Sequence, residues 1–249
     1  MTQMLASVTS VEEALLAIEL GADIIDLKNP HDGALGALPL ATLASIVIAI
    51  DGRRTVSATI GDAPDDAARI AQKVVATAAT GVDIVKIGIA TSRSHLAFWQ
   101  GKAYLAGPRP ATGAGPEPAS TRLVAVLFAD EAFDLAWIDA LAERGFYGVM
   151  LDTADKHAGG LRSHCDDARL QNFVQRAHSK HLMCGLAGSL RLDDISPLLA
   201  LSPDYLGFRG ALCRNTSRTD QLDADAFRAV RARIFELDAA SETFAFSVA

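Results

Sequence analysis

The chain has 249 residues, of which 50% are hydrophobic and 21% are charged. This composition excludes an intrinsically disordered protein and suffices to bury a large core without disulfide or metal support. The formal net charge of −7 argues against a general nucleic-acid binder, because that class needs a basic surface. A local basic pocket for a small anionic molecule stays compatible with this charge.

Cysteine usage and hydropathy indicate the compartment. The 3 cysteines are widely spaced and form no CxxC pair, which is typical of a reduced protein rather than a disulfide framework. The N-terminus lacks the basic and apolar regions of a signal peptide. The most apolar run, residues 41–50, is too short to span a bilayer. We therefore expect a cytoplasmic protein with no membrane partner.

Strand-like and helix-like segments alternate along the chain. After the first strand, a helix opens at Ser10, where Glu13 completes a capping box, and Gly21 ends it. The expected strands cover residues 4–8, 22–28, 55–60, 83–89, 122–128, 148–152, 182–186 and 205–209. The later helices are expected over residues 39–50, 62–81, 131–144, 166–180, 193–201 and 220–237.

Repeated βα units in a chain of this length predict an α/β protein made of one closed (β/α)8, or TIM, barrel over residues 1–249. A doubly wound open sheet is the alternative, and the lack of a GxGxxG motif after the first strand argues against it. Residues 101–121 break the alternation and are rich in Gly, Pro and Ala. They predict a long surface loop, for which a lid and a disordered excursion are both open. The tail after Asp238 is expected to be a peripheral extension.

A weak internal repeat points to the site. A helix-ending glycine followed by a strand recurs at residues 21–28, 81–88 and 145–152. Side chains alternate between two faces along a strand, and the mainly aliphatic face must meet the outer helices. Asp26, Lys28, Lys86 and Asp152 should then point into the barrel. Because alternate strands supply one interior layer, we expect Lys28 and Asp152 in one layer and Asp26 and Lys86 in the layer below.

Two lysines and two aspartates at the C-terminal mouth suit catalysis, because barrel enzymes place their sites there. A lysine beside another cation in a dry pocket has a lowered pKa, and its amine can attack a carbonyl to form a Schiff base. Asp26 and Asp152 are candidates to move protons or to set the charge of the lysines. Lys156 follows on the adjoining loop, where an ordinary solvated lysine is an equal alternative. A buried ion-pair network without catalysis is the alternative for the whole cluster.

The substrate is expected to carry phosphate. Barrels that bind phosphate use the loops after strands seven and eight, where glycines let backbone N–H groups approach the anion. The candidate phosphate-binding residues are Gly185, Gly188, Ser189, Gly207, Arg209 and Gly210. Ordinary βα turns are the alternative for these glycines, and a plain loop role is favoured for His31 and Asp32.

Other site chemistries lack a motif. The histidines form neither an HxH nor an HExxH pattern, so no metal site is expected, although carboxylates could still hold Mg²⁺ through a substrate phosphate. Neither a P-loop nor a serine nucleophile elbow occurs. We expect no cofactor.

Several segments together resemble the (5-formylfuran-3-yl)methyl phosphate synthase family. They are Asp23-Ile-Ile-Asp-Leu-Lys-Asn-Pro30, Gly33-Ala-Leu-Gly36, Val85-Lys-Ile-Gly88, Asp152-Thr-Ala-Asp-Lys156 and Gly185-Leu-Ala-Gly-Ser-Leu190. The resemblance implies that two molecules of glyceraldehyde 3-phosphate condense to a phosphorylated furan aldehyde on a TIM barrel, toward methanofuran or a bacterial analogue. It also implies that Lys28 forms the Schiff base and Lys86 accepts a proton. Asp26, Asp152 and Lys156 would be supporting polar residues.

Two other functions share these features. One is a different Schiff-base aldolase or an isomerase acting on triose phosphates, and the other is a non-catalytic barrel that binds a phosphometabolite. The second lysine below the first argues against binding alone. The Gly/Pro-rich loop at 101–121 is not a feature that the resemblance accounts for. A homo-oligomer with a triose phosphate as its small-molecule partner is expected.

Overall fold

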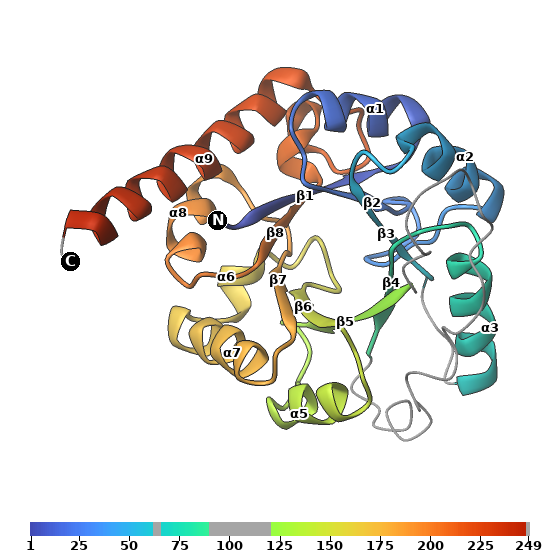
Figure 1. The fold of residues 1–249 in the computed structure, drawn as a ribbon, viewed down its shortest axis with the longest axis horizontal. Helices are drawn as coiled ribbons and strands as arrows, with labels where there is room; N and C mark the ends of the chain where they lie inside the picture. Colours follow the sequence, from blue (N-terminus) through green and yellow to red (C-terminus); the bar gives the residue numbers. More distant parts are fainter. Residues whose placement is uncertain (62–65, 90–120, 248–249) are drawn as a thin grey trace.

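Eight parallel strands close into a barrel in chain order in a computed structural model that describes residues 1–61, 66–89 and 121–247, with side chains to residue 237 (Figure 1). The closed barrel confirms the predicted fold class and excludes the open sheet. The strands are β1 Gln3–Val8, β2 Ile24–Leu27, β3 Thr55–Thr59, β4 Ile84–Gly88, β5 Arg122–Phe128, β6 Gly148–Asp152, β7 Met183–Leu186 and β8 Tyr205–Phe208. Residues 101–120 of the expected loop lie outside the described residues, so both interpretations of that loop stay predictions.

Helices surround the barrel on its outside (Figure 1). They are α1 Val11–Glu19, α2 Leu40–Ile50, α3 Ala67–Ala78, α5 Ala136–Glu143, α6 Leu161–His164, α7 Asp167–Ser179, α8 Leu192–Leu199 and α9 Ala224–Ser247, with short 3₁₀ turns η1 Gly210–Leu212 and η2 Arg214–Thr216 before α9. Among the described helices, none combines the length and hydrophobicity needed to cross a membrane.

Two helix termini differ from expectation. At α1, the Ser10 hydroxyl accepts the Glu13 N–H as predicted, but the Glu13 carboxylate accepts from the N–H and hydroxyl of Thr9 rather than from Ser10. The last helix continues to Ser247, ten residues beyond the expected end at 237, and its final part projects away from the barrel (Figure 1). The peripheral tail is therefore a continuation of α9.

Alternation along the strands separates two apolar clusters. One lies between the strands and the helices and contains Ile25, Val85 and Leu151. The other fills the barrel interior and contains Ile24, Ile84 and Met150, the neighbours of those residues along the same strands. The polar side chains of the interior therefore occupy the same strand face as the inner cluster, as the period of two predicts.

The loop after β2 folds over the C-terminal mouth. Ala34 and Leu35 are buried in the inner cluster, and the Gly36 carbonyl accepts hydrogen bonds from Asn29 N at 2.8 Å and from the Thr59 hydroxyl at 2.9 Å. A Cβ on Gly36 would lie 2.2 Å from the Asn29 carbonyl oxygen, so only glycine fits this close return of the chain. This loop, residues 29–36, is called the mouth loop below.

Candidate active site

The lower interior layer holds a sealed ion pair. Lys86 Nζ lies 2.6 Å from Asp26 Oδ1, and the side chains are 3% and 0% exposed. The Asp26 carboxylate also accepts hydrogen bonds from Ser7 Oγ at 3.1 Å and Ser57 Oγ at 2.6 Å. Met150 Sδ lies 3.9 Å from Lys86 Nζ in the same layer. The carboxylate is fully paired, which is the condition for tolerating a buried charge.

The upper layer holds a second cluster at the mouth. Asp152 Oδ1 lies 2.5 Å from Lys156 Nζ and accepts the Thr153 N–H at 2.8 Å. Lys156 is 8% exposed and also donates to the Thr153 hydroxyl, so it belongs to the cluster and is not a solvated loop lysine. Lys28 is 9% exposed and donates to the Ala34 carbonyl of the mouth loop at 3.3 Å.

Burial and charge together set the state of these groups. Burial lowers the pKa of Lys28 from 10.5 to about 8, with Lys156 adding to the effect and Asp152 opposing it. Burial alone would raise the pKa of Asp152, but the charges of Lys156 and Lys28 outweigh it and lower the value to about 2. Lys28 therefore has a substantial neutral fraction at mildly alkaline pH, while Asp152 stays ionised.

The four inward-facing residues thus occupy the two layers that the repeat predicted. The sequence reasoning missed Ser7 and Ser57, which complete the hydrogen bonding of Asp26. Ser7 carried a signal, since it is the one polar residue of the predicted strand over residues 4–8. Ser57 carried none, because Thr55 and Thr59 make its strand polar at several positions. Among the described residues, no group of three or more His, Cys, Asp or Glu is placed to hold a metal.

Two of the predicted phosphate-binding glycines serve interior packing. A Cβ on Gly185 would lie 2.1 Å from Tyr205 Cζ, so this glycine makes room for the tyrosine ring. A Cβ on Gly207 would lie 2.9 Å from Met150 Cε. Gly210 opens η1, where a Cβ would lie 3.0 Å from the Thr216 carbonyl oxygen. At each of the three, a protein atom lies close to where a Cβ would be, so packing within the protein accounts for the glycine.

The turn after β7 fits the phosphate prediction better. Gly188 and Ser189 have φ values of 111° and 49°, a pair of left-handed residues directly beyond the strand. Within residues 1–61, 66–89 and 121–247, neither N–H donates a hydrogen bond to the protein, whereas the Gly188 carbonyl accepts from Leu161. Two adjacent unused N–H donors in such a turn are suited to bind an anion.

Arg209 does not have the free guanidinium that the sequence interpretation assumed. Its five N–H groups donate to both Glu13 carboxylate oxygens and to the backbone carbonyls of Ser7, Arg218 and Asp220. The Arg209–Glu13 ion pair is mostly buried, with exposures of 7% and 13%. No donor is left for phosphate, so we assign Arg209 to the scaffold, where it joins the end of β8 to the start of α1.

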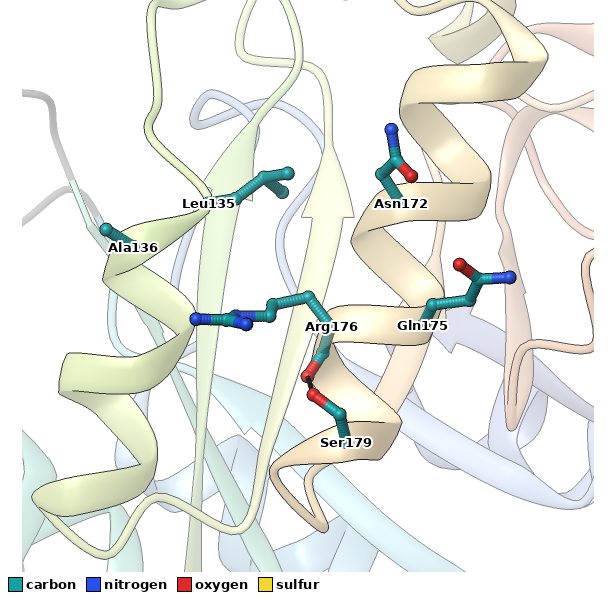
Figure 2. Close-up of a pocket in the computed structure, with 6 residues that line it drawn as sticks. All are labelled: Leu135, Ala136, Asn172, Gln175, Arg176 and Ser179. Atoms are coloured by element: carbon teal, nitrogen blue, oxygen red, sulfur yellow. Dashed lines mark hydrogen bonds between the residues drawn. The ribbon is translucent and has the colours of Figure 1, made fainter.

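A hollow of about 440 Å³ lies elsewhere, between α5 and α7 on the outside of the barrel (Figure 2). It is lined by Leu135, Ala136, Asn172, Gln175, Arg176 and Ser179. It contains none of the inward-facing lysines or aspartates, and Arg176 is already paired with Asp139. The buried lysines and aspartates are concentrated at the barrel mouth, and we place the candidate site there.

Comparison with known proteins gives consistent matches. The family model described as 4-HFC-P synthase matches residues 4–231. A Methylorubrum extorquens protein, to which the name (5-formylfuran-3-yl)methyl phosphate synthase is provisionally given, is 41% identical over 234 residues, covering 92% of each chain. The (5-formylfuran-3-yl)methyl phosphate synthase of Methanopyrus kandleri is 35% identical over 223 residues, covering 87% of this chain and 91% of that protein.

Solved structures share the fold at low identity. TrpF from Jonesia denitrificans superposes with a TM-score of 0.64 at 14% identity, covering 96% of this chain and 98% of that one. KGPDC from Streptococcus mutans has a TM-score of 0.64 at 13% identity, with coverages of 95% and 98%. These likenesses support the barrel alone.

Proposed function

The chain belongs to the 4-HFC-P synthase family and is an enzyme, and from that premise we propose that it joins two molecules of glyceraldehyde 3-phosphate through a Schiff base on Lys28. The product would be (5-formylfuran-3-yl)methyl phosphate, a precursor for methanofuran or an analogue. Atoms balance when one phosphate and two waters leave, so no oxidant or cofactor is needed. By reaction type this is a carbon–oxygen lyase acting on phosphates.

The observation that carries the proposal is the amine of Lys28 at the mouth, with its pKa lowered to about 8. Neutral amine is the nucleophile that attacks a carbonyl. Its contact in the described structure is one hydrogen bond to the Ala34 carbonyl at 3.3 Å, which the amine can give up as it bonds to carbon. In the proposed reaction, one triose phosphate first isomerises to its ketone. The Lys28 amine then condenses with that ketone, and water is released.

The sealed pair below supplies proton transfer. While Lys86 is an ammonium it can only donate, but passing its proton to Asp26, 2.6 Å away, leaves an amine that accepts one. We assign this relay to the carbon beside the Schiff base, where losing a proton gives the enamine. The enamine attacks the aldehyde of the second triose phosphate, and elimination of phosphate, ring closure and dehydration give the furan.

Asp152 and Lys156 support the upper layer. Because its pKa is lowered to about 2, Asp152 stays an anion and balances the two nearby lysines. Lys156 is paired with that carboxylate and is the candidate proton donor to departing hydroxide or phosphate. The Gly188–Ser189 turn is the candidate backbone site for one substrate phosphate.

The experiment is to incubate the protein with glyceraldehyde 3-phosphate and borohydride, and to locate any reduced adduct by intact and peptide mass spectrometry. A parallel reaction without borohydride is scanned for furan-aldehyde absorbance. We expect an adduct on Lys28 and a new chromophore, both lost in Lys28→Ala and retained in the surface control Lys180→Ala.

Each other outcome redirects the assignment. An adduct without the chromophore would make the protein a different Schiff-base aldolase. Bound ligand without an adduct would support a phosphometabolite-binding barrel. Substantial furan formation by Lys28→Ala would refute the role of Lys28.

Two further properties belong to this proposal. We propose a cytoplasmic enzyme, which agrees with free, buried thiols at Cys165, Cys184 and Cys213. We also propose a homo-oligomer, because Ile48 and Leu40 of α2 expose 71% and 48% of their surface. Light scattering during size-exclusion chromatography tests the second point, and a monomer at micromolar concentration would contradict it.

A further inference from the structure

Arg209 and Arg218 both follow β8, and their side chains make opposite use of their hydrogen-bond donors. All the N–H groups of the Arg209 guanidinium donate hydrogen bonds within the protein, and its Nε donates to the Arg218 carbonyl oxygen at 2.9 Å. The main chain of Arg218 is therefore fixed by a buried ion-paired residue. The Arg218 side chain extends from this fixed point to the mouth loop.

The Arg218 guanidinium reaches across to the mouth loop. Its Nη2 donates to the Gly33 carbonyl at 2.9 Å, and within the described ranges of the chain no other acceptor receives a hydrogen bond from it. The side chain is half-buried. Burial lowers the pKa of Arg218, while the nearby charge of Asp152 opposes that effect. A tethered, partly desolvated guanidinium with unused N–H groups thus lies near the upper cluster.

The charges around it favour an anion. Two of the buried charged pairs, Asp26–Lys86 and Glu13–Arg209, neutralise themselves. Of the remaining buried charges at the mouth, Lys28 and Lys156 outnumber Asp152. Arg218 adds a further positive charge beside them, in a chain whose overall charge is −7. Local excess charge in a partly desolvated mouth concentrates anions there.

We propose that Arg218 binds the phosphate monoester of a triose phosphate at the barrel mouth, with the Gly33 carbonyl holding one edge of the guanidinium and the remaining N–H groups facing the phosphate oxygens. The substrate class rests on the function proposed above. A planar guanidinium matches two phosphate oxygens at once, which a lysine does not. Arg218 thereby takes the role that the sequence interpretation gave to Arg209.

The test compares two aldehydes that differ in the phosphate alone. Borohydride trapping on Lys28 is measured against concentration for glyceraldehyde 3-phosphate and for glyceraldehyde, in wild type, Arg218→Ala, Arg218→Lys and the exposed control Arg214→Ala. Losing charge-assisted hydrogen bonds to phosphate should raise the half-saturating concentration of the phosphorylated aldehyde about 10- to 100-fold in Arg218→Ala. Trapping of glyceraldehyde should change less than about twofold, Arg218→Lys should be intermediate, and Arg214→Ala should match wild type.

A purely structural role gives a different pattern. If Arg218 only pins the mouth loop through Gly33, both aldehydes lose trapping together, and the proposal is overturned. Equal saturation in Arg218→Ala and wild type also overturns it. Added guanidinium ion should partly restore the trapping of the phosphorylated aldehyde in Arg218→Ala. It would not restore trapping if the variant had lost it through disorder of the mouth loop.

Failure of the synthase proposal leaves this inference testable. Calorimetric titration with inorganic phosphate measures the contribution of Arg218 to phosphate binding without any adduct on Lys28. Circular dichroism checks that each variant is folded. If wild type binds phosphate and Arg218→Ala does not, the inference is supported even when no furan forms. Wild type that binds neither phosphate nor the phosphorylated aldehyde refutes it.

Discussion

Replacing Lys28 with methionine should stabilise the protein while abolishing its proposed chemistry. The folded state lowers the Lys28 pKa from 10.5 to about 8, chiefly by burial, so it disfavours the ammonium relative to the unfolded chain. Each tenfold change in proton affinity corresponds to about 1.4 kcal/mol, and the penalty at pH 7 is therefore about 3 kcal/mol. Methionine fills a similar volume without charge.

One lost contact offsets part of this gain. Lys28→Met leaves the Ala34 carbonyl without its donor, which costs about 1 kcal/mol. The net stabilisation at pH 7 is then about 2 kcal/mol, or a Tm higher by roughly 4–8 °C for a chain of this size.

The pH dependence has a fixed sign. Below pH 8 both states carry the proton and the wild-type penalty is complete. Between pH 8 and 10.5 the unfolded state binds more protons than the folded state, so wild-type stability rises with pH and the advantage of Lys28→Met shrinks. Above pH 10.5 the difference due to this proton is gone.

Thermal unfolding followed by circular dichroism at pH 7 and pH 10 measures both effects. Lys180→Met is the control, because Lys180 is 38% exposed and paired with Asp139, and exposed pairs contribute about 1 kcal/mol or less. A Lys28→Met Tm at or below that of wild type at pH 7 would refute the reasoning. So would an advantage that stays constant from pH 7 to pH 10.

Three further changes test the scaffold by urea unfolding. Asp26→Asn strands the buried Lys86 ammonium and should lower the free energy of unfolding by about 3–5 kcal/mol; adding Lys86→Met should restore most of it, and no restoration would contradict the pairing. Gly185→Ala places a Cβ 2.1 Å from Tyr205 Cζ and should lower that free energy by about 1–3 kcal/mol; Tyr205→Leu in the same chain should recover part of the loss. Arg209→Lys removes a bidentate, buried fork and should lower the free energy of unfolding by about 2 kcal/mol, and an unchanged midpoint would argue against its scaffold role.

The barrel and its inward-facing charges could be predicted because both depend on short-range periodicity. A period of two assigns each strand residue to a face, and the repeated glycine aligns the strands with one another. Those two rules sufficed to place Asp26 with Lys86 and Lys28 with Asp152. The two rules also apply to residues that are far apart in sequence, because the pairing register of the strands brings such residues to the same height in the barrel.

The residues proposed to bind phosphate were harder to predict, because their roles depend on contacts between distant loops. The Arg209 guanidinium pairs with Glu13, 196 positions earlier, and Arg218 bonds to Gly33, 185 positions earlier. Nothing local distinguishes an arginine with satisfied donors from one with free donors. Likewise, Gly185 and Gly188 look alike in sequence, yet one admits a tyrosine ring and the other adopts a left-handed φ.

Asp26 lies in β2 and Lys28 is the first residue after it, and their spacing of two explains why this one segment reaches both layers. Two residues along a strand rise by about 6.6 Å, so the proposed relay pair lies one layer beneath the amine that we propose forms the adduct. A pair neutralised by its own charges can be sealed, as Asp26 and Lys86 are at 0% and 3% exposure. In the proposed reaction the Lys28 amine must instead meet the substrate, and it lies under the mouth loop, whose Ala34 carbonyl it can release. Exchanging the two layers would bury the proposed nucleophile and expose the proposed relay, so the order of Asp26 and Lys28 along the chain is part of the mechanism that we propose.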